Sequence, residues 1–271
     1  MMNNIAIQEH IVGWLANYVE NTGVNGFVVG ISGGIDSALT STLCALTGCK
    51  TVLVEMPIHQ AKDQVSRGKK HIEFLLDNFE NCSTMVMDLT ASYDSFLLEL
   101  NQKADINKSE EIKNLTLGNT RARLRMTTLY AVAGIEGLLV AGTGNKVEDF
   151  GVGFYTKYGD GGVDVSPIAD LYKTQVYELA EFLGVNQDIL VAPPTDGLWD
   201  DGRTDEDQIG ATYAELEMAM ELQEKYGHLI PEDAFENSRQ KEVWEIYISR
   251  WRANQHKMNP IPVCVIPGDF K

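Results

Sequence analysis

The sequence predicts an α/β protein with a doubly wound, mainly parallel sheet that is flanked by helices and followed by C-terminal helices. Short apolar, β-prone runs alternate with longer helical segments. The segments between these runs have the length that a crossover between parallel strands requires. The run over residues 137–142 is apolar at nearly every position, as expected for a parallel strand that is covered on both faces.

Length and composition favour one globular domain over residues 1–271. We expect the sheet core at about 24–190 and a helical part at about 203–255, with no glutaminase domain. The chain is 44% apolar, but no stretch has the roughly 18 consecutive apolar residues of a membrane span. Neither a signal peptide nor a disulfide framework is evident in the sequence, so we expect a cytoplasmic protein without membrane contact.

The net charge of −17 argues against a nucleic-acid partner, because affinity for nucleic acid depends on basic residues that neutralise phosphates. An acidic protein can still bind a nucleotide if its site gathers the few basic residues and a divalent cation. The positions of the 22 lysines and arginines are therefore informative.

Hydrophobic periodicity and glycine or proline breaks define the expected elements of the first half. We expect strands over residues 27–31, 50–56, 84–89 and 137–142. The helices are expected over residues 5–18, 36–46, 60–79, 91–106 and from 118 to about 133, with 107–111 as a loop or a helix start.

Two long loops interrupt the second half, and long loops in compact domains tend to be functional. The first covers residues 143–167 and is rich in glycine, and the second covers 193–204. Helices are expected over residues 171–183, 204–224 and 231–254, before a tail from 256 to 262 that its prolines keep extended.

The turn after the first strand, Ser32 to Ser37, is a candidate phosphate site. Its adjacent glycines, Gly33 and Gly34, can adopt positive φ and expose backbone N–H groups. The helix that begins behind them adds unpaired donors and the positive end of its dipole. The turn lacks the Walker and dinucleotide-binding patterns. A plain strand-to-helix turn with a serine or aspartate cap is the alternative for this segment alone.

Two carboxylates follow neighbouring strands of the expected sheet. Asp36 comes after the first strand and Glu148 after the fourth. Since ligands of open α/β sheets gather beyond the carboxyl ends of strands, these acids are candidates to meet there and bind Mg²⁺. The alternative is that each is a solvated surface acid.

The turn Ser32-Gly33-Gly34-Ile35-Asp36-Ser37 resembles the pyrophosphate loop of the ATP pyrophosphatase superfamily, whose adenine nucleotide alpha hydrolase-like fold agrees with the expected sheet. Further segments are similar to NAD synthetase, keep the order of that family and span nearly the whole chain. These segments cover residues 118–126, 142–148, 156–164, 167–176, 194–199 and 256–257.

The resemblance implies a reaction in which ATP adenylates deamido-NAD and ammonia displaces AMP, with Mg²⁺ held by Asp36 and Glu148. It assigns catalytic roles to Asp36, Lys173 and Asp164. ATP would contact Gly30, Ile31, Ser32, Gly33, Gly34, Ile35, Asp36, Ser37, Thr143, Lys173 and Thr195. Deamido-NAD would contact Arg123, Lys157, Asp164, His256 and Lys257.

The residues themselves support some of these roles more than others. Lys173 stands at a helix start, an unfavourable place for a cation unless an anion is near; a solvated lysine is the alternative. Arg121, Arg123 and Arg125 cannot all share one helical face, and only the resemblance selects Arg123. Lys146 has no matched role and is expected on the surface. The sequence departs from the family pattern directly after His256-Lys257, where an arginine and a proline are common.

Other interpretations remain at this point. Another amide-forming ATP pyrophosphatase or a tRNA thiolase would share the first loop, although the negative charge and the lack of paired cysteines disfavour the thiolase. A nucleotide sensor without turnover is the alternative from another class. The resemblance further implies a homodimer. Because the synthetase pattern begins within the first 40 residues, we expect free ammonia as the nitrogen source.

Overall fold

The computed structural model describes residues 2–60, 62–104, 109–195 and 204–271. Its centre is a parallel four-stranded sheet in the order β3-β2-β1-β4. The chain builds β1 first, moves outward to β2 and β3, and then returns to the other side of β1. The order therefore reverses beside β1, where α/β proteins bind ligands. The predicted fold class is confirmed. The strands are β1 Gly26–Gly30, β2 Lys50–Glu55, β3 Cys82–Val86 and β4 Leu139–Val140.

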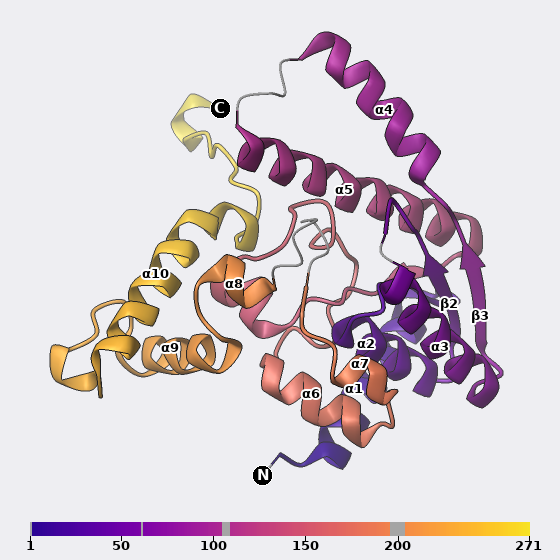
Figure 1. Ribbon diagram of the computed structural model, residues 1–271, viewed down its shortest axis with the longest axis horizontal. Coiled ribbons are helices and arrows are strands. Elements are labelled where there is room, and N and C mark those ends of the chain that lie inside the picture. Colours follow the sequence, from indigo (N-terminus) through magenta and orange to yellow (C-terminus); the bar gives the residue numbers. More distant parts are fainter. Residues whose placement is uncertain (1, 61, 105–108, 196–203) are drawn as a thin grey trace.

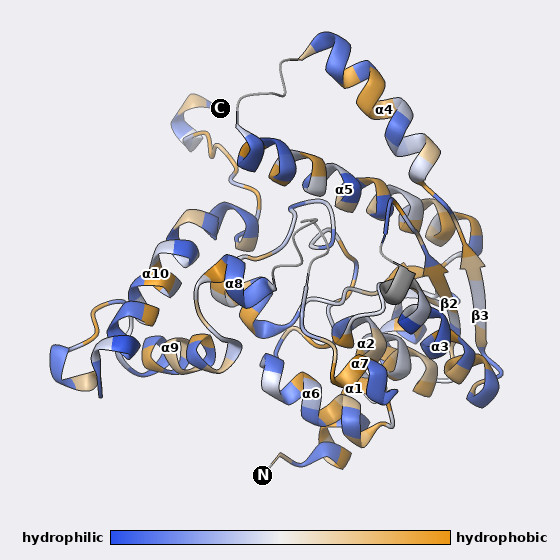
Figure 2. Ribbon diagram, viewed as in Figure 1, coloured by the Kyte–Doolittle hydropathy of each residue, from blue (hydrophilic) through white to orange (hydrophobic). Residues whose placement is uncertain are grey.

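Helices cover both faces of this sheet (Figure 1). On one face, α1, α2 and α6 close a core around the fully buried Phe27, Leu39 and Leu179. On the other face, α5 packs on Val28 and Val140. Figure 2 shows hydrophobic residues on the strands and also along α4, which lies at the edge of the molecule. These helices are α1 Asn4–Thr22, α2 Ile35–Leu46, α3 Lys62–Asn78, α4 Thr90–Lys103, α5 Glu110–Glu136, α6 Lys173–Phe182 and α7 Gln187–Leu190.

A third core belongs to a C-terminal helical lobe beside the sheet (Figure 1). Leu216 and Tyr247 are at its centre, and Val147 and Val152 join it from the long loop after β4. The sheet and this lobe therefore share the segment that carries Glu148. The lobe contains a π-helix Val147–Val152, α8 Asp205–Ile209, α9 Tyr213–Tyr226, the 3-10 turn Glu232–Ala234 and α10 Ser238–Met258, and a 3-10 turn Gly268–Phe270 lies in the tail.

Several expected boundaries were wrong for identifiable reasons. Helix α5 begins at Glu110, within the segment expected as a loop or a helix start, and continues through 118, where a separate helix was expected to open. The Ser109 side chain caps it by accepting from the backbone N–H of Ile112 at 3.2 Å. The helix expected over 204–224 is two helices, since Gly210 at φ 92° ends α8. Helix α10 continues to Met258, so His256 and Lys257 are helical and the extended tail begins later.

The strands also differ from expectation. Strand β3 begins two residues earlier than predicted and ends at Val86. Only Leu139–Val140 of the fourth expected strand pair with β1, and Ala141 forms a bridge with Val165 instead. Among the described residues, no helix is long and apolar enough to cross a membrane.

Candidate active site

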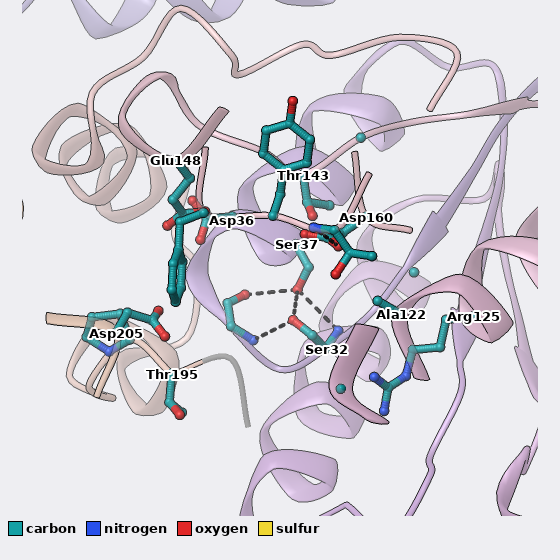
Figure 3. A pocket seen from close by; sticks show the side chains of 18 of the residues that line it. Ser32, Asp36, Ser37, Ala122, Arg125, Thr143, Glu148, Asp160, Thr195 and Asp205 are labelled. Carbon is teal, nitrogen blue, oxygen red and sulfur yellow. Dashed lines mark hydrogen bonds between the residues drawn. The ribbon is translucent and has the colours of Figure 1, made fainter. Parts of the chain in front are cut away.

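The turn between β1 and α2 is held by its own serines (Figure 3). The Ser32 hydroxyl accepts from the backbone N–H of Gly34 at 3.2 Å and lies 3.0 Å from the Ser37 hydroxyl, which donates to the Gly34 carbonyl at 3.0 Å. Gly33 has φ 81°, which disfavours any residue with a Cβ. The N-cap of α2 is Gly34, and within the described part of the chain no side chain caps the first N–H groups of the helix. Those groups are left to bind an anion.

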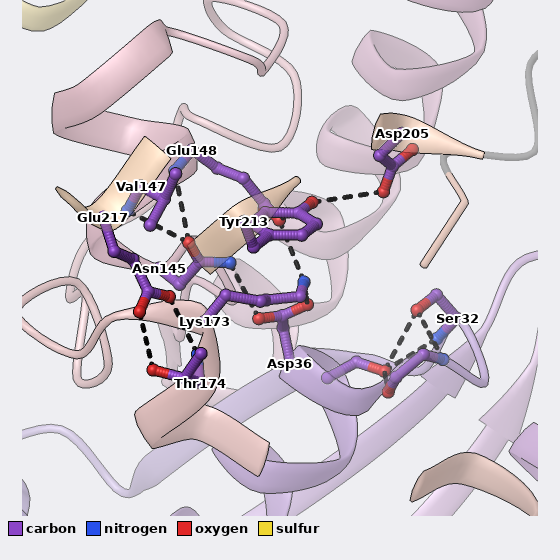
Figure 4. A network of polar contacts seen from close by, with 12 residues as sticks. Ser32, Asp36, Asn145, Val147, Glu148, Lys173, Thr174, Asp205, Tyr213 and Glu217 are labelled. Carbon is purple, nitrogen blue, oxygen red and sulfur yellow. Dashed lines mark hydrogen bonds and ion pairs between the residues drawn. The ribbon is translucent and has the colours of Figure 1, made fainter. Parts of the chain in front are cut away.

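Lys173 lies between two carboxylates directly beyond this turn (Figure 4). Its Nζ donates to Asp36 Oδ2 at 2.6 Å and to Glu148 Oε1 at 2.9 Å, and the residue is 3% exposed. Asn145 donates through Nδ2 to Asp36 Oδ1 at 3.0 Å, while its Oδ1 accepts from the backbone N–H of Glu148 at 3.2 Å. Tyr213 donates its hydroxyl hydrogen to Glu148 Oε1 at 2.7 Å. Side chains from four segments thus converge at this point. We call Asp36, Glu148 and Lys173 the ion cluster.

Burial and charge act against each other in this cluster. Burial alone would lower the pKa of Lys173, but the charges of Asp36 and Glu148 outweigh it and raise that pKa. Burial opposes ionisation of Glu148, yet Lys173, Tyr213 and Asn145 together lower its pKa. For Asp36 burial is the larger effect, and its pKa is raised. Lys173 therefore stays a cation at neutral pH, and the cluster presents a fixed positive charge next to two acids.

A cavity of about 780 Å³ opens at this edge of the sheet. The phosphate turn, the ion cluster and the loops after β4 line it (Figure 3). Its volume lies in the range of nucleotide-sized sites. The predicted ATP contacts all contribute to its lining: Gly30, Ile31, Ser32, Gly33, Gly34, Ile35, Asp36, Ser37, Thr143, Lys173 and Thr195. The segment 196–203, which carries most of the predicted motif over 194–199, lies outside the described residues.

Arginines that the sequence analysis did not select also line the cavity. Arg121 and Arg125 lie on α5, and Arg67 and Arg250 come from α3 and α10. Arg125 donates through Nε to the Met56 carbonyl at 3.0 Å, and burial lowers its pKa to about 10. Residues four apart share a helix face, so the spacing of 121 and 125 was a usable signal, and the resemblance drew attention to Arg123 instead.

The five residues expected to bind deamido-NAD lie in three places. Lys257 lines the cavity, and its Nζ donates to the carbonyls of Gly153 at 2.7 Å and Tyr155 at 2.9 Å. Arg123 is exposed and donates through Nε to the Lys157 carbonyl at 3.1 Å.

Three more residues expected to bind deamido-NAD, like Arg123, lie outside the cavity lining. The Lys157 ammonium donates to the His256 carbonyl, which joins these two residues to Arg123. Asp164 is fixed apart from them, because it accepts from the Tyr130 hydroxyl at 2.9 Å and from the backbone N–H of Val140 at 2.8 Å. Among the described residues, Arg123, Lys157, Asp164 and His256 do not line the cavity.

Two further acids accompany the ion cluster. Asp160 lines the cavity and accepts from the backbone N–H of Thr156 at 3.0 Å, and burial raises its pKa. Burial, reinforced by the charges of Glu148, Asp160 and Asp36, raises the pKa of Asp149 to about 8. Neither acid was predicted as a site residue, because acids within a glycine-rich loop are usually solvated.

The donor set is compatible with Mg²⁺ as a companion of bound phosphate. Within the described ranges no group of three or more His, Cys, Asp or Glu residues could hold a metal by itself. Asp36 and Glu148 supply two carboxylates on either side of Lys173. Mg²⁺ commonly takes one or two carboxylates and completes its octahedron with phosphate oxygens and water. A site that is completed by a nucleotide would have this composition.

Comparison with known proteins extends the argument over the whole chain. The family model described as NAD synthase matches residues 7–261. An NH₃-dependent NAD⁺ synthetase from Methanococcoides burtonii is 40% identical over 224 residues, which cover 81% of this chain and 80% of that protein. An NH₃-dependent NAD⁺ synthetase from Syntrophomonas wolfei is 34% identical over 277 residues, and this match covers 100% of both chains.

Solved structures show the same fold. An NMN synthetase from Francisella tularensis has a TM-score of 0.82 and 30% identity, and the match covers 99% of this chain and 100% of that one. An NH₃-dependent NAD synthetase from Campylobacter jejuni has a TM-score of 0.76 at 24% identity, with 97% and 100% covered. A family match of this extent does not favour another ATP pyrophosphatase. The chain belongs to the NAD synthase family.

Proposed function

We propose that this protein amidates deamido-NAD with ammonia at the expense of ATP, and forms NAD, AMP and pyrophosphate. One observation carries the proposal: Lys173 is held between Asp36 and Glu148 beside the N-terminus of α2, whose N-cap Gly34 provides no side-chain cap. This arrangement suits a polyphosphate whose charge must be neutralised and whose position must be fixed.

In the first step, a carboxylate oxygen of the nicotinate attacks the α-phosphorus of ATP and pyrophosphate leaves. The turn Ser32–Ser37 and the N-terminus of α2 would hold the departing pyrophosphate through backbone N–H groups. Lys173 would offset the charge that develops on it. Asp36 and Glu148 would hold Mg²⁺, which when bound neutralises phosphate charge and orients the leaving group.

In the second step, ammonia attacks the acyl carbon of the adenylate, AMP leaves with the former carboxylate oxygen, and the nitrogen releases one proton to the solvent. A carboxylate is a poor acceptor because its leaving group would be oxide, and adenylation removes that obstacle. No side-chain nucleophile is needed. Asp164, which the Tyr130 hydroxyl and the Val140 N–H fix in place, would orient the substrate or the incoming ammonia.

The second nucleotide would extend from the cavity toward Arg123, Lys157, His256 and Lys257, in addition to Asp164. Contacts of Arg123 with Lys157 and of Lys157 with His256 support a common binding surface for these three residues. A homodimer is part of the proposal, since α4 and α5 expose a series of large apolar side chains that a second copy could cover. They are Phe96, Leu98, Ile112, Leu115 and Ile135, each more than half exposed.

The substrate could also be the deamidated mononucleotide, because a structural relative at TM-score 0.82 is an NMN synthetase. The chemistry at the carboxylate would be identical. The two candidate substrates differ only in the AMP half of the dinucleotide, which would occupy the surface outside the cavity and which the mononucleotide lacks.

A coupled assay separates these candidates. The protein is incubated with ATP, Mg²⁺ and ammonium, with either deamido-NAD or nicotinate mononucleotide, and the nucleotides are separated by chromatography. We expect NAD and AMP in equal amounts, and a higher kcat/KM for the dinucleotide. A preference for the mononucleotide would select the second candidate, and AMP release without either acceptor would contradict both. A glutamine arm tests the nitrogen source, for which we expect activity with ammonium and none with glutamine.

A further inference from the structure

The ion cluster is supported from two separate cores. Asp36 and Lys173 lie at the start of α2 and α6, which pack on the sheet. Glu148 lies in the π-helix whose neighbours Val147 and Val152 belong to the core of the C-terminal lobe. The distance between Glu148 and its partners therefore depends on how the lobe is held against the sheet. Contacts between the lobe and the sheet must fix this distance, because a displacement of a site residue by about 1 Å can lower the reaction rate about a hundredfold.

Helix α9 makes two polar contacts beside the ion cluster, from residues four apart and so on one face. One orients Glu148 within the lobe, and the other joins the lobe to α6. Tyr213 is 5% exposed and donates its hydroxyl hydrogen to Glu148 Oε1 at 2.7 Å (Figure 4). That oxygen also accepts from Lys173. The ring of Tyr213 lies 4.9 Å from Lys173 Nζ, measured to the ring centroid, and its hydroxyl lies 3.4 Å from Asp205 Oδ2.

Glu217 makes the second contact. It is 9% exposed, and its carboxylate accepts from the backbone N–H of Thr174 at 3.0 Å and from the Thr174 hydroxyl at 2.7 Å (Figure 4). Thr174 follows Lys173 in the first turn of α6, where backbone N–H groups lack partners within the helix. A carboxylate also interacts favourably with the positive end of the helix dipole there. Glu217 thus ties the lobe to the turn that carries Lys173.

From these contacts we infer that Tyr213 and Glu217 are positioning residues for the ATP centre, which hold Glu148 and Lys173 at the separation that nucleotide and metal binding require. Tyr213 acts on the carboxylate and Glu217 on the lysine. The inference rests on the proposed function, because the ion cluster matters only if it binds the nucleotide. It adds that the C-terminal lobe supports the reaction through α9. Residues of α9 would position Glu148 and Lys173 and would not touch the reacting atoms.

Tyr213→Phe tests the first contact, because it removes one hydroxyl and keeps the ring over Lys173. Tyr247→Phe is a matched control: Tyr247 is also buried in the lobe, and its hydroxyl donates to Gln223, away from the cavity. We expect Tyr213→Phe to raise the Mg²⁺ concentration for half-maximal rate about tenfold, as is typical when a partner of a metal ligand is lost. Tyr247→Phe should shift the melting temperature alone.

Glu217→Gln tests the second contact, because it removes the carboxylate charge and leaves one acceptor oxygen for the two donors of Thr174. Its control is Glu215→Gln on the same helix, whose carboxylate caps α9 at Thr212 and pairs with Arg239. We expect Glu217→Gln to reduce kcat at least fivefold and Glu215→Gln to leave kcat within twofold of wild type. Thermal unfolding of all four variants shows whether each remains folded under assay conditions.

A binding measurement gives a readout that does not depend on turnover. Mn²⁺ is titrated in the presence of an ATP analogue with a methylene group between the α- and β-phosphates, and free Mn²⁺ is followed by electron paramagnetic resonance. We expect weaker Mn²⁺ binding in Tyr213→Phe and unchanged binding in Tyr247→Phe. Equal Mn²⁺ affinity and equal rates in Tyr213→Phe and wild type would overturn the inference while leaving the proposed function intact. Wild-type protein that binds Mn²⁺ and the analogue but forms no NAD or NMN would instead refute the proposed function.

Discussion

Replacing Lys173 with methionine removes the buried cation that holds two largely buried carboxylates together. Nζ lies 2.6 Å from Asp36 Oδ2 and 2.9 Å from Glu148 Oε1. At an effective dielectric constant of about 20, each contact corresponds to about 6 kcal/mol of Coulomb attraction, most of which the cost of burying the charges offsets. Loss of one partner of a buried ion pair typically destabilises a protein by about 3–5 kcal/mol. We expect Lys173→Met to lower the free energy of unfolding by that amount at pH 8.

The pH dependence of this loss gives the sharper test. In the wild type, the lowered pKa of Glu148 contributes stability that is present above the ordinary carboxyl pKa and is lost as pH falls through the folded value. Without Lys173 the pKa of Glu148 should rise above its unfolded value, and the pKa of Asp36, which burial already raises in the wild type, should rise further. Stability of the variant should then fall as pH rises from 5 to 8, because the folded state binds more protons than the unfolded state.

Urea unfolding at pH 5 and pH 8 measures this effect. Lys146→Met is the control, because Lys146 makes surface pairs with Glu224 at 3.1 Å and Asp170 at 3.6 Å. Exposed pairs contribute about 0–1 kcal/mol, so this variant should show a small loss that is similar at both pH values. A destabilisation by Lys173→Met that is under 1 kcal/mol at pH 8, or larger at pH 5 than at pH 8, would refute the electrostatic account of the cluster.

Three further predictions concern binding and assembly. Asp36→Asn should lower kcat at least a hundredfold in the NAD-forming assay with an unchanged circular dichroism spectrum, and retention of full rate would dismiss the metal role. Gly33→Ala forces a Cβ at φ 81°, so calorimetry should show weaker ATP binding and unfolding should show a loss of about 1–2 kcal/mol, whereas wild-type affinity would argue against the turn as the phosphate site. Leu98→Glu combined with Leu115→Glu should give a monomer in analytical ultracentrifugation if α4 and α5 form the dimer interface, and an unaltered dimer would place the interface elsewhere.

The sequence predicted the sheet and the phosphate turn because their signals are local. An apolar run followed by Ser-Gly-Gly and a helical segment permits few alternatives, and Asp36 and Glu148 follow from the rule that ligands gather beyond strand ends. Lys173 was selected by the family resemblance and by its unfavourable place at a helix start. The partners of these residues could not be predicted in the same way. Tyr213 contacts Glu148, and Glu217 contacts Thr174 beside Lys173, only because the C-terminal lobe packs against the loop after β4 and against α6, which is a tertiary relation.

Capping decided where sequence reasoning on helices failed. Helix α5 begins about two turns before residue 118 because Ser109 caps it, and Gly210 ends α8 so that one expected helix is two. Both residues are recognised cap types, but neither stood at the edge of a clear apolar stripe. Arg121 and Arg125 show a different difficulty, because their place on one helix face was readable while the direction of that face was not.

Isotope transfer tests the central claim most directly. Deamido-NAD is prepared with ¹⁸O in both oxygens of the nicotinate carboxylate and is converted with ATP, Mg²⁺ and ammonium. Adenylation followed by displacement of AMP places one ¹⁸O in the phosphate of AMP and retains one in the amide of NAD, and mass spectrometry distinguishes these products. We predict singly labelled AMP and unlabelled pyrophosphate. Formation of ADP with labelled orthophosphate, or AMP without label, would contradict the account.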